Sequence, residues 1–153
     1  MKVISGGQTG VDTAALEAAI KLGCSYGGWV PKGRLNENGV ISSKYHGLRE
    51  TSSADVGERT VLNVRDSDAL LVLTDGNHSG GTQLAIQEAE KLRIPTCIIV
   101  MEEGAETDAS QRIMEFLRDT NPNKVNIAGP RESEAPGIEI RAKSVLEKAL
   151  VSI

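Results

Sequence analysis

Two glycine-rich segments carry the residue types that can bind an anion. The first, residues 5–12 (SGGQTGVD), follows the apolar Val3 and Ile4; the second, residues 75–82 (DGNHSGGT), follows the aliphatic run at 69–73. Each stands between an expected strand and an expected helix. Such a loop lets backbone N–H groups approach an anion, and the N-terminus of the following helix adds partial positive charge. The two segments together predict a site for a phosphorylated or oxyanionic small molecule.

The first loop supplies polar side chains beyond what a tight turn requires. Thr9 can donate to an oxyanion beside the backbone amides. Asp12 can accept from a ribose or pterin donor, or simply favour the first turn of the helix. The loop has neither the P-loop lysine nor the G-x-G-x-x-G spacing of dinucleotide-binding proteins. The candidate binding residues here are Gly6, Gly7, Gln8, Thr9, Gly10 and Asp12.

The second loop places hydroxyl groups and glycines where a helix begins. We expect Gly80, Gly81 and Thr82 to bind an anion at that helix N-terminus. Asp75 and Ser79 complete the candidates in this loop.

Three cations can supply countercharge to an anionic ligand. Lys32 and Arg34 flank a glycine after an expected strand, and Arg131 follows the last expected strand. Arginine and lysine in such positions can clamp a phosphate or carboxylate. The same side chains are equally consistent with solvated charges on loops.

Arg59 and Asn63 lie one helical turn apart and therefore share a helix face. Arg59 can contact a ligand from this face. Alternatively, it can form an ion pair with Asp55 or Glu58.

The elements that must position these loops alternate along the chain. Strands are expected at 2–5, 27–31, 68–74, 96–100 and 124–127, and helices at 10–22, 53–67, 80–93, 107–120 and 136–151. The alternation predicts an α/β fold with a doubly wound, mainly parallel sheet in a Rossmann-like three-layer α/β/α arrangement. Residues 32–53 are expected to form a long polar loop without regular structure that covers part of the ligand.

Composition excludes several classes of function. The chain of 153 residues is expected to form one domain, residues 1–153, and its net charge of −4 argues against nucleic-acid binding. No apolar stretch is long enough to span a membrane, and the N-terminus does not resemble a signal peptide. We therefore expect a cytoplasmic protein with Cys24 and Cys97 reduced. No Cys/His cluster has metal-ligand spacing, so no metal site is expected.

Several stretches resemble the molybdenum cofactor carrier protein family. They include residues 6–12, 28–34 (GWVPKGR), 48–51, 63–68, 80–82 and 126–133 (NIAGPRES), and they span nearly the whole chain. The resemblance implies a Rossmann-like fold and the molybdenum cofactor (molybdopterin) as a carried ligand. It further implies molybdoenzymes as recipients and a homo-oligomer, either a dimer or a tetramer.

This family looks like part of a larger Rossmann-like superfamily. The superfamily also includes the cytokinin-activating phosphoribohydrolases, which were once called lysine decarboxylases. Their motif P-G-G-x-G-T-x-x-E places a glutamate three residues after the threonine. Here Gly81 and Thr82 match, but Ala85 stands at the glutamate position. This departure removes the obvious acid–base group for cleaving an N-glycosidic bond.

The leading hypothesis is a non-catalytic carrier of a phosphorylated small molecule, with no catalytic residue assigned. The alternative is an enzyme that processes a nucleotide or nucleotide sugar, with Asp12, Glu50 or Asp75 as its carboxylate. A pKa raised by burial at one of these would favour the enzyme. A sensor of a nucleotide-derived ligand would use the same site.

Overall fold

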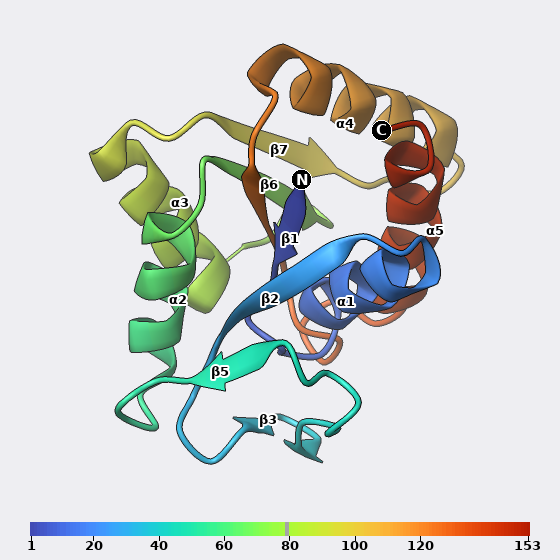
Figure 1. Cartoon of the computed structure of the whole chain (residues 1–153). Helices are drawn as coiled ribbons and strands as arrows, with labels where there is room; N and C mark the ends of the chain where they lie inside the picture. The colour runs from blue at the N-terminus through green and yellow to red at the C-terminus, as the bar shows by residue number, and fades with distance from the viewer. Residues whose placement is uncertain (79) are drawn as a thin grey trace.

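The computed structural model describes residues 1–78 and 80–153. Strands and helices alternate through most of this chain (Figure 1). In order, the elements are β1 (Lys2–Ile4), α1 (Val11–Lys21), β2 (Ser25–Val30), β3 (Leu35–Asn36), β4 (Gly39–Val40), β5 (Leu48–Glu50), α2 (Val56–Arg65), β6 (Ala69–Thr74), α3 (Gly80–Leu92), β7 (Thr96–Val100), α4 (Glu106–Thr120), β8 (Lys124–Ala128) and α5 (Ile138–Leu150).

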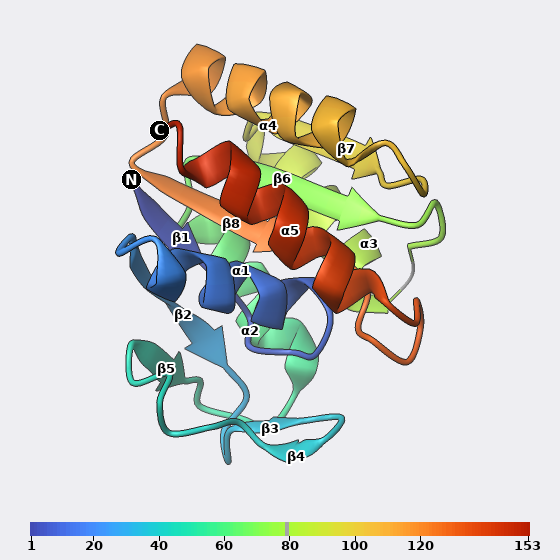
Figure 2. The ribbon, with the colours of Figure 1, turned by 90° about the vertical axis from the view of Figure 1, so that its right-hand side faces the viewer.

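The main sheet has six strands in the order β5-β2-β1-β8-β6-β7, and every neighbouring pair is parallel. Helices α1, α4 and α5 cover one face, while α2 and α3 cover the other (Figures 1 and 2). The expected doubly wound, Rossmann-like three-layer fold is thus confirmed.

The core is aliphatic, as the scarcity of aromatic residues requires. All six residues of β6 are buried, which explains why this segment reads as an uninterrupted apolar run. Helix α1 buries four alanines, at positions 14, 15, 18 and 19. Their small side chains let the helix backbone approach the sheet closely.

Residues 32–53 differ from the expectation of an irregular loop. Leu35–Asn36 and Gly39–Val40 form the antiparallel β3–β4 hairpin, and Leu48–Glu50 adds β5 in parallel to the edge of the main sheet. These strands are two or three residues long, too short to show a periodic pattern. These short strands are held in place by pairing with one another and with β2.

The two loops predicted to bind an anion follow β1 and β6 and therefore both lie at the carboxyl ends of the parallel strands. The chain moves from β1 through α1 to β2 in one direction, and from β6 through α3 to β7 in the other, with β8 between β1 and β6. Open α/β sheets bind ligands where the direction reverses, at the carboxyl ends of the strands.

None of the helices in residues 1–78 and 80–153 has the length and apolar character needed to cross a membrane.

Candidate functional site

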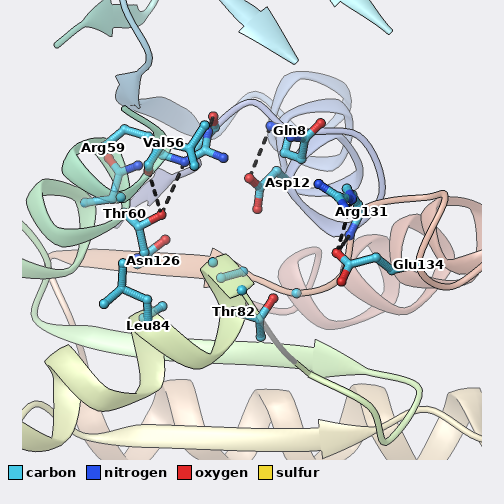
Figure 3. A pocket seen from close by; sticks show the side chains of 18 of the residues that line it. Gln8, Asp12, Val56, Arg59, Thr60, Thr82, Leu84, Asn126, Arg131 and Glu134 are labelled. Carbon is cyan, nitrogen blue, oxygen red and sulfur yellow. Dashed lines mark hydrogen bonds and ion pairs between the residues drawn. The ribbon is translucent and has the colours of Figure 1, made fainter. Parts of the chain in front are cut away.

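A pocket of about 350 Å³ opens at this reversal point. Its wall is formed by the starts of α2 and α3, the loop that follows β1 and the end of β8 (Figure 3). The volume lies at the lower end of the range for small-molecule sites.

The first turn of α2 forms one side of the pocket. Asp55 caps this helix by accepting a hydrogen bond from the N–H of Gly57 at 2.9 Å. Asp55, Val56 and Gly57 all line the pocket. The helix dipole therefore places partial positive charge at this wall, although the Asp55 carboxylate offsets part of it.

The first turn of α3 forms the opposite side. Gly80, Gly81 and Thr82 line the pocket, and Thr82 is only 7% exposed. The first N–H groups of a helix have no acceptor within it. Because no first-turn carboxylate offsets the α3 dipole, this end favours an anion.

Asp12 lies at the start of α1 and faces the same pocket (Figure 3). Its Oδ2 atom accepts a hydrogen bond from the N–H of Gln8 at 3.2 Å. The carboxyl is buried, and this burial raises its pKa to about 6, although the positive charge of Arg59 and the Gln8 hydrogen bond act to lower the pKa. Asp12 is therefore a carboxyl group that can change protonation near neutral pH.

Arg59 reaches the pocket from α2. Its Nη1 atom donates to the carbonyl oxygen of Gly6, and its Nε atom donates to the Thr60 hydroxyl at 3.3 Å. Burial lowers the pKa of Arg59, while the nearby Asp12 opposes that shift. The alternative ion pairs with Asp55 or Glu58 are wrong, because the guanidinium turns toward the β1 loop instead.

Asp12 and Arg59 both pack closely against the backbone of Gly6. A Cβ atom on residue 6 would lie 2.9 Å from Asp12 Oδ2 and 3.2 Å from Arg59 Nη1. Glycine at this position therefore lets a carboxyl group and a guanidinium group approach the same stretch of backbone, where any side chain would crowd them.

Asn126, in the middle of β8, lines the pocket and is only 4% exposed. Among the residues that the structure describes, no group hydrogen-bonds its side-chain amide. In contrast, the amide of Asn63 is fully engaged, accepting from the N–H of Trp29 at 2.7 Å and donating to its carbonyl oxygen at 3.0 Å. An amide that lines a pocket and has no protein partner can donate to and accept from a ligand, so Asn126 is suited to hydrogen-bond one.

The charged side chains along the pocket have mixed sign. Arg59 and Arg131 are positive, and Asp12, Asp55 and Glu134 are carboxylates. Arg131 lies 3.5 Å from Glu134, measured between Nε and Oε1. The pocket is therefore suited to a ligand with an anionic end and a separate part rich in hydrogen-bond donors.

The structure brings about half of the predicted binding residues together. Those that line the pocket are Gly6, Gln8, Asp12, Gly80, Gly81, Thr82 and Arg131. Ser79 lies outside the described residues.

Gly7, Thr9 and Gly10 of the first loop are not among the pocket-lining residues. Gly7 packs toward Val30 and Ile41, and the backbone of Gly10 packs against the carbonyl of Pro130. Gly10 has φ 78°, a conformation that favours glycine. Thr9 donates its hydroxyl hydrogen to Glu37 rather than facing the pocket.

Lys32, Arg34 and Asp75 are not among the pocket-lining residues. The Arg34 guanidinium donates to backbone carbonyl oxygens at positions 42, 45 and 48, at 3.1–3.5 Å, and so orders the segment before β5. Lys32 is exposed, and Asp75 accepts the N–H of Asn77 in the turn after β6. Glu50, a candidate carboxylate of the enzyme alternative, accepts the N–H of Gly33 at 2.7 Å and also lies outside the pocket.

Sequence reasoning missed Asn126 and the start of α2 as parts of the site. Asn126 occupies the middle of the strand K-V-N-I-A, where a polar residue between two aliphatic residues was the available signal. Val56 and Gly57 carry no comparable signal. In the described part of the chain, no three His, Cys, Asp or Glu residues are grouped to hold a metal ion.

The fold and the site define a Rossmann-like α/β protein with a pocket at the reversal point of its sheet. The chain belongs to the circularly permutated YpsA SLOG family, whose model matches residues 3–150.

A solved structure from Syntrophus aciditrophicus SB, described as a "putative molybdenum carrier protein", is 41% identical with a TM-score of 0.92. The match covers 97% of this chain and 94% of the relative. No curated protein matches the chain.

Proposed function

We propose that this protein binds a phosphorylated heterocyclic molecule in the pocket between α2 and α3 and carries it without chemical change. The molybdopterin form of the molybdenum cofactor is the ligand we propose, because the relative of known structure is named as a molybdenum carrier. The pocket supports this proposal by combining an anion-favouring helix end with buried polar groups that suit a heterocycle.

The residues of the pocket fit such a ligand. We place its phosphate at the first turn of α3, where Gly81 and Thr82 offer backbone N–H groups and a hydroxyl. The ring would lie toward Asn126 and Asp12, because an amide and a carboxyl group complement the N–H and carbonyl groups of a pterin edge. Leu84 would contact its apolar face.

The cofactor itself, when bound, supplies the coordination of molybdenum through its dithiolene sulfurs. The protein's part is to hold the phosphate and the ring and to limit access of water. We further propose a cytoplasmic homo-oligomer that passes its ligand to molybdoenzymes. Size-exclusion chromatography with light scattering tests the oligomer, since a monomer would contradict it.

Titration with molybdopterin, released anaerobically from a purified molybdoenzyme, tests the binding site. Thr82→Glu puts a carboxylate in the first turn of α3, where it would repel the phosphate. We expect at least about tenfold weaker binding, equivalent to about 1.4 kcal/mol.

The matched control is Thr107→Glu, in the first turn of α4, where the side chain is exposed and outside the pocket. This variant should bind as the wild type does. Equal affinities of all three proteins, or no binding by the wild type, would contradict the proposal.

Asp12 favours a second candidate function, hydrolysis of the N-glycosidic bond of a nucleotide. Its buried carboxyl has a pKa of about 6 and lines the pocket, as a general acid or base requires. Incubation with nucleoside 5′-monophosphates, followed by chromatography of the released base, tests this candidate. Release of base by the wild type that is lost in Asp12→Asn would support hydrolysis. If the wild type releases no base from any of the nucleotides, the result counts against hydrolysis.

A further inference from the structure

Glu37 extends from the turn of the β3–β4 hairpin to the loops that follow β1 and β8. Its Oε1 atom accepts the Ser133 hydroxyl at 2.5 Å and lies 3.4 Å from Arg131 Nε. Its Oε2 atom accepts the Ser133 N–H at 3.2 Å and the Thr9 hydroxyl. A single carboxylate therefore occupies a site, here called the Glu37 site, formed by Thr9, Ser133 and Arg131.

These donors are the kinds that bind phosphate and other oxyanions. Two hydroxyl groups, one backbone N–H and one guanidinium converge on the two oxygens of Glu37. Burial acts to raise the pKa of Glu37, but the hydrogen bonds from Ser133 and Thr9 outweigh it, so that the pKa is lowered. The occupant is thus an anion held by groups from two separate loops.

We propose that the Glu37 site is an oxyanion-binding site, and that a phosphate-like anion competes with the Glu37 carboxylate for Thr9, Ser133 and Arg131. A phosphate can accept from the same donors with three oxygens where the carboxylate uses two. The site adjoins the pocket, because Arg131 lines the pocket as well. Glu37 accordingly acts as an internal competitor at the mouth of the pocket.

The tip of the hairpin that carries Glu37 is held mainly by polar contacts. Its remaining contacts with the first loop are polar: Asn36 donates to the Gly7 carbonyl at 3.1 Å, and the Glu37 N–H donates to Gln8 Oε1 at 3.0 Å. Leu35 and Val40, which pair across the hairpin, are 54% and 74% exposed. Ile41, which follows β4, is buried against Val30 and Leu48 and anchors the base of the hairpin. Since little apolar surface holds residues 35–40 themselves, release of the hairpin tip mainly breaks hydrogen bonds.

This inference goes beyond the proposed carrier function and does not require a pterin ligand. The phosphate proposed for the carried ligand binds at α3, whereas the Glu37 site takes a second oxyanion. The latter can be free in solution or belong to a larger ligand. Their separation makes the two proposals testable independently.

Calorimetric titration with inorganic phosphate tests the competition. In Glu37→Gln the competing charge is gone and a side chain of similar size remains, so phosphate should bind about tenfold or more tightly than to the wild type. The same gain is expected when Thr82→Glu is present in both proteins, because that substitution acts only at the α3 end. Guanosine 5′-monophosphate, titrated in parallel, distinguishes a free anion from the phosphate of a larger ligand.

Asn36→Ala is the matched control, since it loosens the hairpin but retains the carboxylate. Its phosphate affinity should stay within about threefold of wild type. A gain equal to that of Glu37→Gln would show that hairpin looseness, not charge, limits binding, and would overturn the proposal. No gain in Glu37→Gln, or a gain abolished by Thr82→Glu, would also overturn it.

Hydrogen exchange supplies a readout that needs no variant. In wild-type protein, saturating phosphate should speed exchange of the amide of Glu37, whose N–H is held by Gln8. Slower exchange there would contradict displacement of the hairpin.

Discussion

Replacing Asp12 by asparagine should stabilise the protein at neutral and alkaline pH. The carboxyl is buried in the pocket wall, and its pKa is raised from 3.8 to about 6, chiefly by desolvation. The folded protein therefore holds the proton of Asp12 more tightly than the unfolded chain does. Asparagine has nearly the same shape, carries no charge, and can still accept the N–H of Gln8.

The size of the change in stability follows from the shift in the pKa of Asp12. A raised carboxyl pKa favours the folded state fully below pH 3.8, and this advantage is lost as the pH rises through 6. A shift of about two pKa units corresponds to a penalty of about 3 kcal/mol for the ionised group. Asp12→Asn removes this penalty, so its advantage over the wild type should be about 2 kcal/mol larger at pH 8 than at pH 4.5.

Urea unfolding measured between pH 4.5 and pH 8 gives the required free energies. Trp29, the single tryptophan, stacks with Arg49 and donates its indole N–H to Asp66 at 2.8 Å, so its fluorescence should report unfolding. Circular dichroism recorded in parallel verifies that both probes follow one transition.

Asp108→Asn is the control for loss of a carboxylate from the first turn of a helix, because Asp108 is exposed at the start of α4. Its effect on stability should change little with pH. If the difference between Asp12→Asn and wild type is the same at pH 4.5 and pH 8, the reasoning about Asp12 is refuted.

Three substitutions separate binding from folding. Gly6→Ala crowds Asp12, because its Cβ would lie 2.9 Å from Oδ2, and should weaken molybdopterin binding about tenfold while circular dichroism stays unchanged. Gly10→Ala should destabilise the fold by about 3 kcal/mol or more in urea unfolding, since φ is 78° and the Cβ would lie 2.3 Å from the Pro130 carbonyl oxygen. Asn126→Ala should weaken binding in the same titration without loss of stability; a clear loss would show that its amide has a protein partner.

Much of the fold was predictable because its elements are long and strongly patterned. The aliphatic run at 69–73 was expected as a strand at 68–74 and forms β6, and helices with regular apolar spacing were placed to within a few residues. The β3–β4 hairpin and β5 were not predictable. These strands are too short to show a periodic pattern, and they are held in place by side-chain contacts within the segment, such as those of Arg34 at positions 42–48.

The site was predictable where glycines and hydroxyls mark the start of a helix. Gly80, Gly81 and Thr82 were predicted from this pattern, and they line the pocket. The cations were harder to place, because spacing along the chain does not reveal which way a long side chain turns. Arg34 turns toward its own loop, whereas Arg59 turns toward the β1 loop and reaches the pocket.

The central claim is that the pocket between α2 and α3 holds a phosphorylated pterin. Native mass spectrometry of protein purified gently and anaerobically from its own cells tests this most directly. The account predicts a bound species with the mass of molybdopterin or another phosphorylated pterin, lost in Thr82→Glu and kept in Thr107→Glu. A nucleotide in its place, or a bound pterin that persists in Thr82→Glu, would contradict the account.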